Sequence, residues 1–488
     1  MKVRIPPSPT GLLHIGTVRT ALYNYLFAKH NDGKMVFRME DTDKKRSTPE
    51  FEKDIIDGLV KLGIAGDEGV HMPDSKGYRQ SERTEVYTAD LKKLLDEDKA
   101  YYCFCTKERL EEMRNEQQAK KLPPRYDSCC AEVSSEEAKK RIEAGEKAVI
   151  RLRVPDSRGD IKWEDLVRGE VIINARELDD FVIARSINDP LYHLTVVSDD
   201  HDMDITHVIR GEDHVSNTPK QILLFEALGW EIPKFGHLPL ILNEDKSKLS
   251  KRKNKVSMDD FLQEGYLPEA LINFLALLGW NTSDEQEIFS MEELVEKFSL
   301  DKVHKGGAVF DVKKLDWING EYIKKAIKED VNGFYETYKS FMPEGDEELV
   351  KKMLNDSDFE GRFKKLSEIK EGLSAIISPL PDYSKDLLLF EKFNITADIL
   401  KPALERAKEV LGGLDWEKGD SNKSQEISDA LVAIVGELEL KNGQVLWPIR
   451  VALSGLERSP NFATLAVYLG KEESIKRLDV ALSKITTR

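Results

Sequence analysis

The residues best suited to chemistry lie in two segments that are far apart in the chain. The first segment, residues 7–17, has the sequence PSPTGLLHIGT and places His14 at the start of an expected helix that follows a strand. Backbone donors and the helix dipole at such a terminus attract anions, and Gly16 lets a flat base or ribose approach the backbone. The pattern favours phosphate binding. A proline-rich turn whose histidine only caps the helix explains this segment alone equally well.

The second segment, residues 248–252, has the sequence KLSKR. Its two lysines, Lys248 and Lys251, are three residues apart and flank Ser250. Such lysines can converge on a triphosphate and stabilise the charge that develops on the transferred phosphorus and on the leaving pyrophosphate. Most short basic runs are solvated surface charge, but the presence of both segments in one chain is much less expected by chance than either alone.

The cysteines form a third candidate site. All four lie between Cys103 and Cys130, which is too localised for a disulfide framework in a chain of 488 residues. They are better interpreted as free thiols or as a metal site. Zinc takes four tetrahedral ligands, and two thiolates separated by one residue, such as Cys103 and Cys105, can share one ion. The alternative is four reduced, partly buried cysteines without a metal.

Composition indicates a soluble globular protein of several domains. The chain is 40% hydrophobic and 33% charged, and its formal charge of −16 argues against indiscriminate binding to polyanions. A nucleic-acid partner must therefore meet a local basic patch, such as residues 44–46 or 251–253. The longest stretches without charge, residues 5–18 and 270–283, have 14 residues each, which is too short for a membrane span. Early prolines rule out a secretory signal, and we expect a cytoplasmic protein.

The order of predicted elements indicates an α/β unit followed by helices. A strand at 2–5, a helix at 15–30 and a strand at 35–39 form half of a doubly wound fold, whose ligands bind at the carboxyl ends of the strands. Further strands are expected at 148–154, 171–174, 181–184 and 194–197, and a helix at 135–143. Residues 258–280 read as helices, no strands are evident beyond about 325, and Gly333 and residues 343–348 resemble linkers.

Taken together, these motifs resemble the bacterial-type glutamyl-tRNA synthetases, a family of class I aminoacyl-tRNA synthetases. The resemblance is specific over residues 1 to about 325 and looser beyond. Thr17 replaces the second histidine of the general class I signature, and Leu249 replaces a methionine. The motifs that carry the resemblance begin at Arg4 (RIPPSPTG), His14 (HIGT), Phe37 (FRMEDTD), Tyr78 (YRQSER), Tyr192 (YHL), Asp199 (DD), His207 (HVIRGED), Lys248 (KLSKR) and Phe310 (FD), the last extending to Gly320.

The resemblance implies a fold and an order of domains. It implies an α/β Rossmann-type catalytic domain with an inserted α+β subdomain, followed by an all-helical C-terminal region. The expected segments are 1–86 for the first Rossmann half, 87–189 for the inserted acceptor-binding subdomain, 190–230 for the second half, 231–325 for a stem-contact domain with the KLSKR loop, and 326–488 for the anticodon-binding region.

It also implies glutamate–tRNA ligation with L-glutamate, ATP and tRNA-Glu as substrates and Mg²⁺ accompanying ATP. Glutamate has an ammonium and two carboxylates, so its pocket needs one acid and at least two cations or strong donors. Glu40 would take the amino group, and Arg4 and Arg210 the carboxylates. The remaining implied residues are Ser8 and Tyr192 for glutamate, and His14, Gly16, Thr17, Lys248, Ser250 and Lys251 for ATP, with His14, Lys248 and Lys251 as the catalytic set.

Two further sites follow from the resemblance. Cys103, Cys105 and Cys130 match a structural zinc site, with Tyr126 as the fourth ligand and Cys129 as an alternative. Arg362 falls where the family reads the anticodon, although an ordinary helix-surface residue is an equally good interpretation. The rival functions are a glutaminyl-tRNA synthetase, which has β-barrels at its C-terminus, a nucleic-acid-binding protein without catalysis, and a truncated paralogue that glutamylates a tRNA base.

We predict that Lys251→Ala slows adenylate formation far more than it weakens glutamate or tRNA binding. A lysine directed at the transferring phosphates acts mainly on charge that develops in the transition state, and the loss of one such group costs roughly 2.7–4 kcal/mol. Pre-steady-state activation rates measure the effect. A decrease of less than about tenfold would identify Lys251 as a solvated surface lysine.

Overall fold

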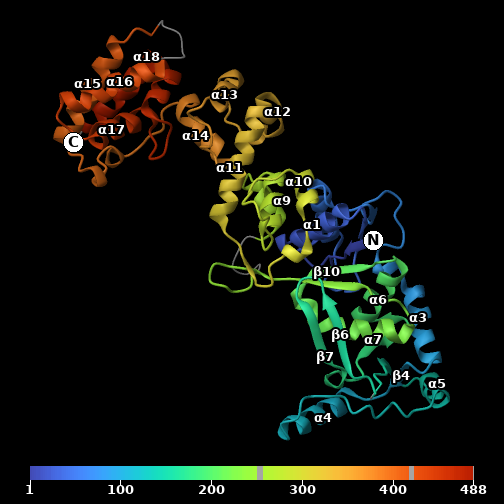
Figure 1. Cartoon of the computed structure of the whole chain (residues 1–488). Helices are drawn as coiled ribbons and strands as arrows, with labels where there is room; N and C mark the ends of the chain where they lie inside the picture. The colour runs from blue at the N-terminus through green and yellow to red at the C-terminus, as the bar shows by residue number, and fades with distance from the viewer. Residues whose placement is uncertain (156, 250–255, 417–422, 487–488) are drawn as a thin grey trace. The chain divides into compact units, whose positions relative to one another are not determined.

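The computed structural model describes residues 1–155, 157–249, 256–416 and 423–486 (Figure 1). The chain divides into two compact units. The first comprises Met1–Gln263 and Pro268–Leu315, and the second comprises Glu264–Leu267 and Asp316–Arg488.

The first unit is organised around parallel strands. β1 (Lys2–Ile5) pairs with β2 (Lys34–Phe37), which pairs with β3 (Glu68–Gly69), and β10 (His207–Gly211) pairs with β11 (Lys234–Leu238). The two sets lie side by side, because the N–H of Thr206 donates to the carbonyl oxygen of Lys2 at 3.0 Å. The last three residues of β1 and of β2 are buried, as expected for strands that are covered on both faces.

Helices cover this sheet. α1 (Ile15–His30) follows the proline-rich turn, with Val18, Ala21 and Leu22 buried, and α2 (Pro49–Lys61) begins at a Thr48 cap. The predicted strand at 2–5 and helix at 15–30 are confirmed with the same bounds. α7 (Thr218–Leu228) ends at Gly229, whose φ of 72° is the left-handed conformation that glycine adopts without strain.

The predicted strand at 194–197 is wrong. These residues lie in α6 (Tyr192–Asp202), in which every residue from Leu194 to Asp200 is buried. A short run of apolar and β-branched residues has the same pattern in a buried strand and in a helix buried on all sides, so periodicity cannot separate the two. As a result, Asp199 and Asp200 lie on a buried helix and not on a loop after a strand.

The segment between the two sets of parallel strands has antiparallel sheets. Strands β4 (Ala100–Cys103), β5 (Val149–Leu152), β8 (Val182–Ser186) and β9 (Asp189–Pro190) form one sheet in that order. β6 (Asp160–Asp165) and β7 (Gly169–Asn174) form a separate hairpin, which packs on β11. The helices of this segment are α3 (Thr84–Asp96), α4 (Lys107–Ala119) and α5 (Ser135–Glu143).

The rest of the first unit is short helices and one small strand pair. β12 (Ile241–Leu242) and β13 (Ala308–Val309) run parallel. The helices here are α8 (Met258–Gln263), α9 (Pro268–Leu277) and α10 (Met291–Lys297), and Figure 1 shows α9 and α10 next to α1. Trp280, Phe289 and Phe298 form an aromatic cluster beneath these helices.

The described part of the second unit is helical. Its elements are α11 (Val312–Glu329), which begins in the first unit, α12 (Val331–Thr337), α13 (Glu347–Leu354), α14 (Ser367–Ile377), α15 (Ala397–Gly413), α16 (Lys423–Glu437), α17 (Asn442–Ser454) and α18 (Phe462–Thr486). Figure 1 shows α15 to α18 as one packed group. α18 is interrupted at Gly470, which has a φ of 72° and a ψ of 175°.

Gly333 does not lie in a linker. It is within α12, where the side chain of Asp330 caps the helix by accepting hydrogen bonds from the N–H groups of Asn332 and Gly333. The sequence signal failed because a single glycine is tolerated within a helix and does not by itself mark a connection. Among the described helices, none is long and apolar enough to cross a membrane.

Candidate active site

A cavity of about 310 Å³ lies at the carboxyl ends of β1, β2 and β10. Residues predicted from two different chemical arguments, phosphate binding and glutamate binding, meet in its wall. The predicted site residues that line it are Arg4, His14, Gly16, Thr17, Glu40, Tyr192, Arg210 and Lys248. Ser8 is exposed and is not part of this lining, and Ser250 and Lys251 lie outside the described residues.

His14 is fixed at the first turn of α1. Its Nδ1 accepts a hydrogen bond from the N–H of Gly16 at 2.9 Å, so a neutral imidazole carries its proton on Nε2. A Cβ at Gly16 would lie 3.2 Å from His14 Nδ1, so a side chain at this position would crowd the ring. An N–H donor and the start of a helix therefore occupy one wall of the cavity, which is the arrangement that binds phosphate.

The two chemical segments of the sequence are adjacent in the fold. The N–H of Ile15 donates to the carbonyl of Val256 at 3.0 Å, and the N–H of Met258 donates to that of Leu13 at 2.9 Å. Lys248 also lines the cavity that His14 lines, its Nζ lies 3.5 Å from Asp213 Oδ2, and more than half of its side chain is exposed. Lys248 and His14 thus face the same cavity from segments that are remote in sequence.

Two buried arginines that line the same cavity each have one unpaired nitrogen. Arg4 Nε lies 3.3 Å from Asp200 Oδ1, and Arg210 donates to His237 Nε2 at 3.2 Å and to the Thr218 hydroxyl at 2.8 Å. In each guanidinium the NH1 group is buried and has no hydrogen-bond partner among the residues that the structure describes. A buried N–H without an acceptor costs free energy, so these two groups are prepared for anionic ligand atoms.

An acid and two neutral groups also line this cavity. Glu40 is 8% exposed; burial raises its pKa, while the positive charges of Arg38 and Arg4 oppose that shift. The Tyr192 hydroxyl lies 3.1 Å from His214 Nδ1. Burial raises the pKa of Tyr192 to about 12 and lowers that of His214 to about 4, so both are uncharged at neutral pH. Glu40 is thus available to a cationic ligand group beside the two arginines.

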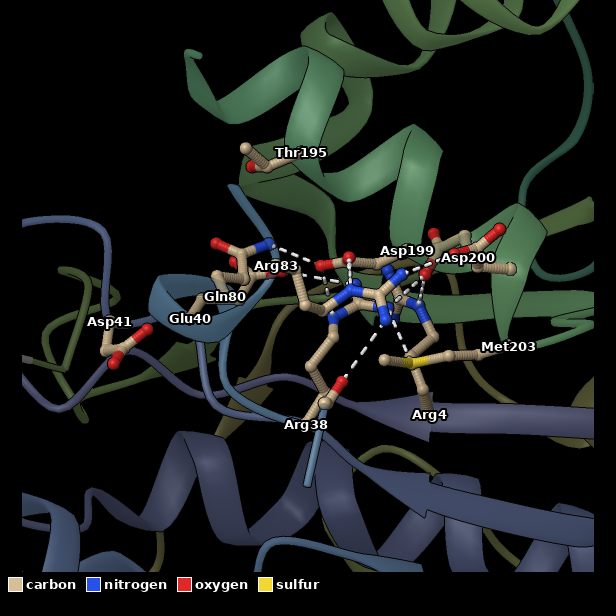
Figure 2. A network of polar contacts seen from close by, with 12 residues as sticks. Arg4, Arg38, Glu40, Asp41, Gln80, Arg83, Thr195, Asp199, Asp200 and Met203 are labelled. Atoms are coloured by element: carbon tan, nitrogen blue, oxygen red, sulfur yellow. Dashed lines mark hydrogen bonds and ion pairs between the residues drawn. The ribbon is translucent and has the colours of Figure 1, made fainter. Parts of the chain in front are cut away.

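A buried ionic network supports these groups (Figure 2). Arg38 lies 2.9 Å from Asp200 Oδ1, 3.4 Å from Asp199 Oδ2 and 3.2 Å from Glu40 Oε1. Burial alone would lower the pKa of Arg38, but Asp200, Asp199 and Glu40 together raise it. The Asp199 carboxylate also accepts hydrogen bonds from Gln80, Arg83 and Tyr87.

Sequence reasoning did not assign roles to Arg38, Asp200 or His214. The available signal was a charge inside an apolar run: Arg38 lies between Phe37 and Met39, and Asp199 and Asp200 follow a buried apolar stretch. Charged residues are almost never fully buried unless they are paired, so such positions point to a partner elsewhere in the chain. The identity of that partner requires the fold.

The four cysteines converge in the antiparallel segment. The Sγ atoms of Cys105 and Cys130 are 3.6 Å apart, and the ligand atoms of Cys103, Cys105 and Cys130 all lie within 4.8 Å of one another. The buried Tyr126 hydroxyl is 3.2 Å from Cys103 Sγ and 3.5 Å from Cys105 Sγ. Cys129, 3.3 Å from Cys105, is exposed. Two ligands of a tetrahedral zinc ion are about 3.5–3.8 Å apart, and the Cys105–Cys130 and Cys105–Tyr126 separations fall in this range.

Arg362 lies in the second unit, near α14. It is exposed, and its guanidinium donates to the carbonyl of Ser459. Arg450 donates to the Ser459 hydroxyl at 2.8 Å and lies 4.6 Å from the centre of the Trp447 ring. Two arginines and an indole therefore gather around the turn at Ser459.

Comparison with known proteins agrees with this arrangement. The family model of the catalytic domain of class I tRNA synthetases (E and Q) matches residues 1–317, and a model of an anticodon binding domain matches residues 333–482. These two matches define a class I tRNA synthetase.

Relatives that match over nearly the full length of the chain identify the family within this class. The glutamate–tRNA ligase of Clostridium tetani is 41% identical over 99% of this chain and 98% of its own, and glutamate–tRNA ligase 2 of Thermoanaerobacter pseudethanolicus is 42% identical over the same shares. The crystal structure of a glutamate tRNA ligase from Elizabethkingia meningosepticum, in complex with its amino acid, superimposes with a TM-score of 0.83 at 33% identity and covers 99% of both chains. The chain belongs to the glutamate–tRNA ligase family.

Proposed function

We propose that the chain is a glutamate–tRNA ligase that activates L-glutamate with ATP and transfers the glutamyl group to the terminal ribose of tRNA-Glu. The observation that carries the proposal is the cavity itself. Its lining includes two buried guanidinium N–H groups and Glu40, and it also includes His14 and Lys248. An amino acid with two carboxylates fits the first set of groups, and a triphosphate fits the second.

The proposed frame is a Rossmann-type domain in two halves, residues 1–86 and 190–230, with residues 87–189 inserted between them. The parallel pairs β1–β2 and β10–β11 and the contact between Thr206 and Lys2 support this frame. We further propose residues 231–325 as a stem-contact domain. The helical character of the described residues beyond 325 is the feature that argues against a glutaminyl enzyme with β-barrels.

Glutamate is held by complementary charge. Glu40 would receive the ammonium group, and the unpaired NH1 groups of Arg4 and Arg210 would each donate to a carboxylate oxygen. Tyr192, uncharged and fixed by its hydrogen bond to His214, would line the side-chain pocket. Pairing these buried groups removes the cost of leaving them unsatisfied, so recognition favours a ligand that supplies both carboxylates.

Activation is an in-line displacement at the α-phosphorus of ATP. A glutamate α-carboxylate oxygen forms a bond to this phosphorus as the bond to the pyrophosphate oxygen breaks, and pyrophosphate carries away the electron pair. Mg²⁺ bound with ATP neutralises phosphate charge. His14, through Nε2–H, and Lys248, together with Lys251 from outside the described residues, would stabilise the phosphates. No protein nucleophile is required.

Transfer uses the mixed anhydride formed in the first step. A hydroxyl of the terminal ribose, the 2′-hydroxyl by family resemblance, attacks the glutamyl carbonyl carbon and AMP leaves. The same resemblance implies that tRNA must bind before activation proceeds. The chain's own contribution is to keep the carboxylate, the phosphate and the incoming hydroxyl within one cavity.

We also propose a structural zinc ion held by Cys103, Cys105, Cys130 and Tyr126. The hydroxyl of the buried Tyr126 contacts both Cys103 and Cys105, whereas Cys129 is exposed. Burial alone would raise the pKa of Cys130, but hydrogen bonds from the Tyr126 hydroxyl and the Phe104 N–H lower it to about 7. Four protein ligands leave no open position, so the ion would support folding and not catalysis.

In the second unit we propose that Arg362 reads the third anticodon base. An arginine only donates hydrogen bonds, and cytosine offers acceptors on its pairing edge where guanine places donors. A guanidinium in this position therefore prefers the C of tRNA-Glu to the G of tRNA-Gln. The match of residues 333–482 to an anticodon binding domain supports this location.

Exchange of radiolabelled pyrophosphate into ATP tests the proposed reaction. We expect exchange with L-glutamate in the presence of tRNA, and little with L-glutamine, because an amide cannot replace the carboxylate that pairs with a buried arginine. Reactions without tRNA and without amino acid are the controls. Exchange supported by glutamine but not by glutamate would contradict the assignment, and tRNA-independent exchange would contradict only the order of binding.

Elemental analysis of the purified protein tests the zinc site. We expect about one zinc per chain, with the zinc content reduced in Tyr126→Phe and unchanged in Cys129→Ser. The free energy of metal binding at this site also stabilises the folded form of the segment. Zinc below about 0.2 equivalents after expression with added zinc would favour the metal-free cysteines. Loss of zinc in Cys129→Ser but not in Tyr126→Phe would show that Cys129, and not Tyr126, is the fourth ligand.

Charging of tRNA-Glu and tRNA-Gln tests the anticodon contact. The wild type should prefer tRNA-Glu, and Arg362→Gln should lose about 1–3 kcal/mol of that preference, the range of one good base contact. Arg406→Gln, which removes an exposed arginine of the same unit, is the matched control. Equal charging by the wild type would contradict the preference, and unchanged selectivity in Arg362→Gln would contradict only the residue.

A further inference from the structure

Arg210 is a buried cation whose near partners are all uncharged. Its Nε donates to His237 Nε2, and one terminal nitrogen donates to the Thr218 hydroxyl and approaches the carbonyl of His214 at 3.4 Å. Within the part of the chain that the structure describes, no carboxylate lies in ion-pair range of it. Arg4 differs, because Asp200 pairs with it directly. The positive charge of Arg210 is thus left for a ligand, but something must still fix its orientation.

His237 provides that orientation through its tautomer. It is completely buried, and its Nδ1 lies 2.5 Å from Asp165 Oδ2. An ionised carboxylate can only accept, so Nδ1 must carry the proton. Arg210 can only donate, so Nε2 must be the bare nitrogen. A protonated imidazolium would direct an N–H at the N–H of Arg210. The neutral Nδ1–H tautomer is therefore the one that the contacts require.

Asp165 is held so that it cannot turn away from His237. Its Oδ1 accepts hydrogen bonds from the N–H groups of Val167, Arg168 and His237, each at 3.1 Å. Oδ2 also accepts from the Trp163 indole at 3.4 Å. Every partner of this carboxylate is a donor. These donors oppose the effect of burial and lower the pKa of Asp165 to about 2.

The turn that carries Asp165 is attached to the wall of the cavity. Asp165 ends β6, and the next residue, Leu166, donates through its N–H to the carbonyl of Phe235 in β11 at 2.8 Å. Arg168 forms an ion pair with Glu212, which follows β10 and also accepts from the N–H of Leu240 at 2.8 Å. The β6–β7 turn is thereby fixed to the strands that carry Arg210 and His237.

We propose that Asp165 and His237 are positioning residues for Arg210, which together direct its unpaired NH1 toward a carboxylate of the amino-acid substrate. The inference deepens the proposed function and rests on it, because the ligand is the glutamate of that proposal. The His237 side chain lies between the Asp165 carboxylate and the Arg210 guanidinium, so the two charges are not in direct contact. Asp165 can therefore orient Arg210 through His237 without neutralising the charge that the substrate needs.

Equilibrium dialysis with radiolabelled L-glutamate, followed by kinetics of the full chain, tests the inference. His237→Leu removes the acceptor, and we expect the glutamate Kd and KM to rise about 10- to 100-fold, with the ATP KM and kcat changed by less than about threefold. His237→Gln can still offer an oxygen to Arg210 and an N–H to Asp165, so it should recover most of the affinity.

The control is Glu164→Gln, which removes an exposed carboxylate from the neighbouring position of β6 and should leave every constant unchanged. Glutamate binding by His237→Leu equal to wild type overturns the inference and leaves the proposed function intact. A wild type that binds no glutamate overturns both. A rise in all constants together, including the ATP KM, indicates a merely structural role and also overturns it.

The wild type provides a second readout in case His237→Leu does not fold. In ¹⁵N-histidine spectra, one imidazole should have a protonated Nδ1 and a bare Nε2 at neutral pH, and its signal should be missing from His237→Gln. An Nε2–H tautomer or an imidazolium at this position overturns the inference, because either would leave Arg210 Nε without its acceptor.

Discussion

The buried cluster of charges around Arg38 is the constraint on which the cavity depends. Arg38 comes directly after β2 and reaches two carboxylates of α6 and Glu40, so it ties the end of a strand to a helix that is remote in sequence. Removing one member of a buried, paired set leaves an uncompensated charge, which costs about 3–5 kcal/mol. The position of Arg4 follows from this cluster, because Asp200 Oδ1 is shared by the two arginines.

The two arginines that line the cavity, Arg4 and Arg210, are supported in different ways, and the difference has a physical reason. Arg4 lies beside a cluster in which the charges of carboxylates and guanidiniums balance. Asp200 is shared within this cluster, so its direct ion pair with Arg4 still leaves Arg4 able to bind an anionic ligand atom. Arg210 is supported by an imidazole and a hydroxyl, and burial lowers its pKa to about 10. It therefore stays protonated at neutral pH while it retains a stronger demand for an anionic partner.

The sequence was sufficient for those elements whose signals are local. The strand at 2–5 and the helix at 15–30 were predicted with their observed bounds, since prolines, apolar residues at helical spacing and Gly33 mark them. The helix at 192–202 was misread as a strand in part, because burial on all sides removes the periodicity.

The sequence could predict the site residues that belong to recognisable motifs. It could not predict the residues that reach the site only through the fold. The residues to which the resemblance assigns roles, and which line the cavity, include His14, Glu40, Tyr192 and Arg210. The partners behind them, such as Arg38 and His237, are separated from their contacts by long stretches of chain, and no spacing rule connects them. Ser8, predicted for glutamate, is exposed and is not among the residues that line the cavity.

The attachment of the β6–β7 turn to β11 has a consequence for how this chain can be divided and recombined. The turn belongs to residues 87–189, a stretch that looks like an exchangeable cassette when only the order of elements is considered. Yet its last strand residue supplies the carboxylate that fixes His237, and its Arg168 pairs with Glu212. A chimaera that imports this stretch from another protein would thus also import, or lose, part of the wall behind Arg210. The ends of residues 87–189 in the sequence therefore do not separate these residues from the cavity that Arg210 lines.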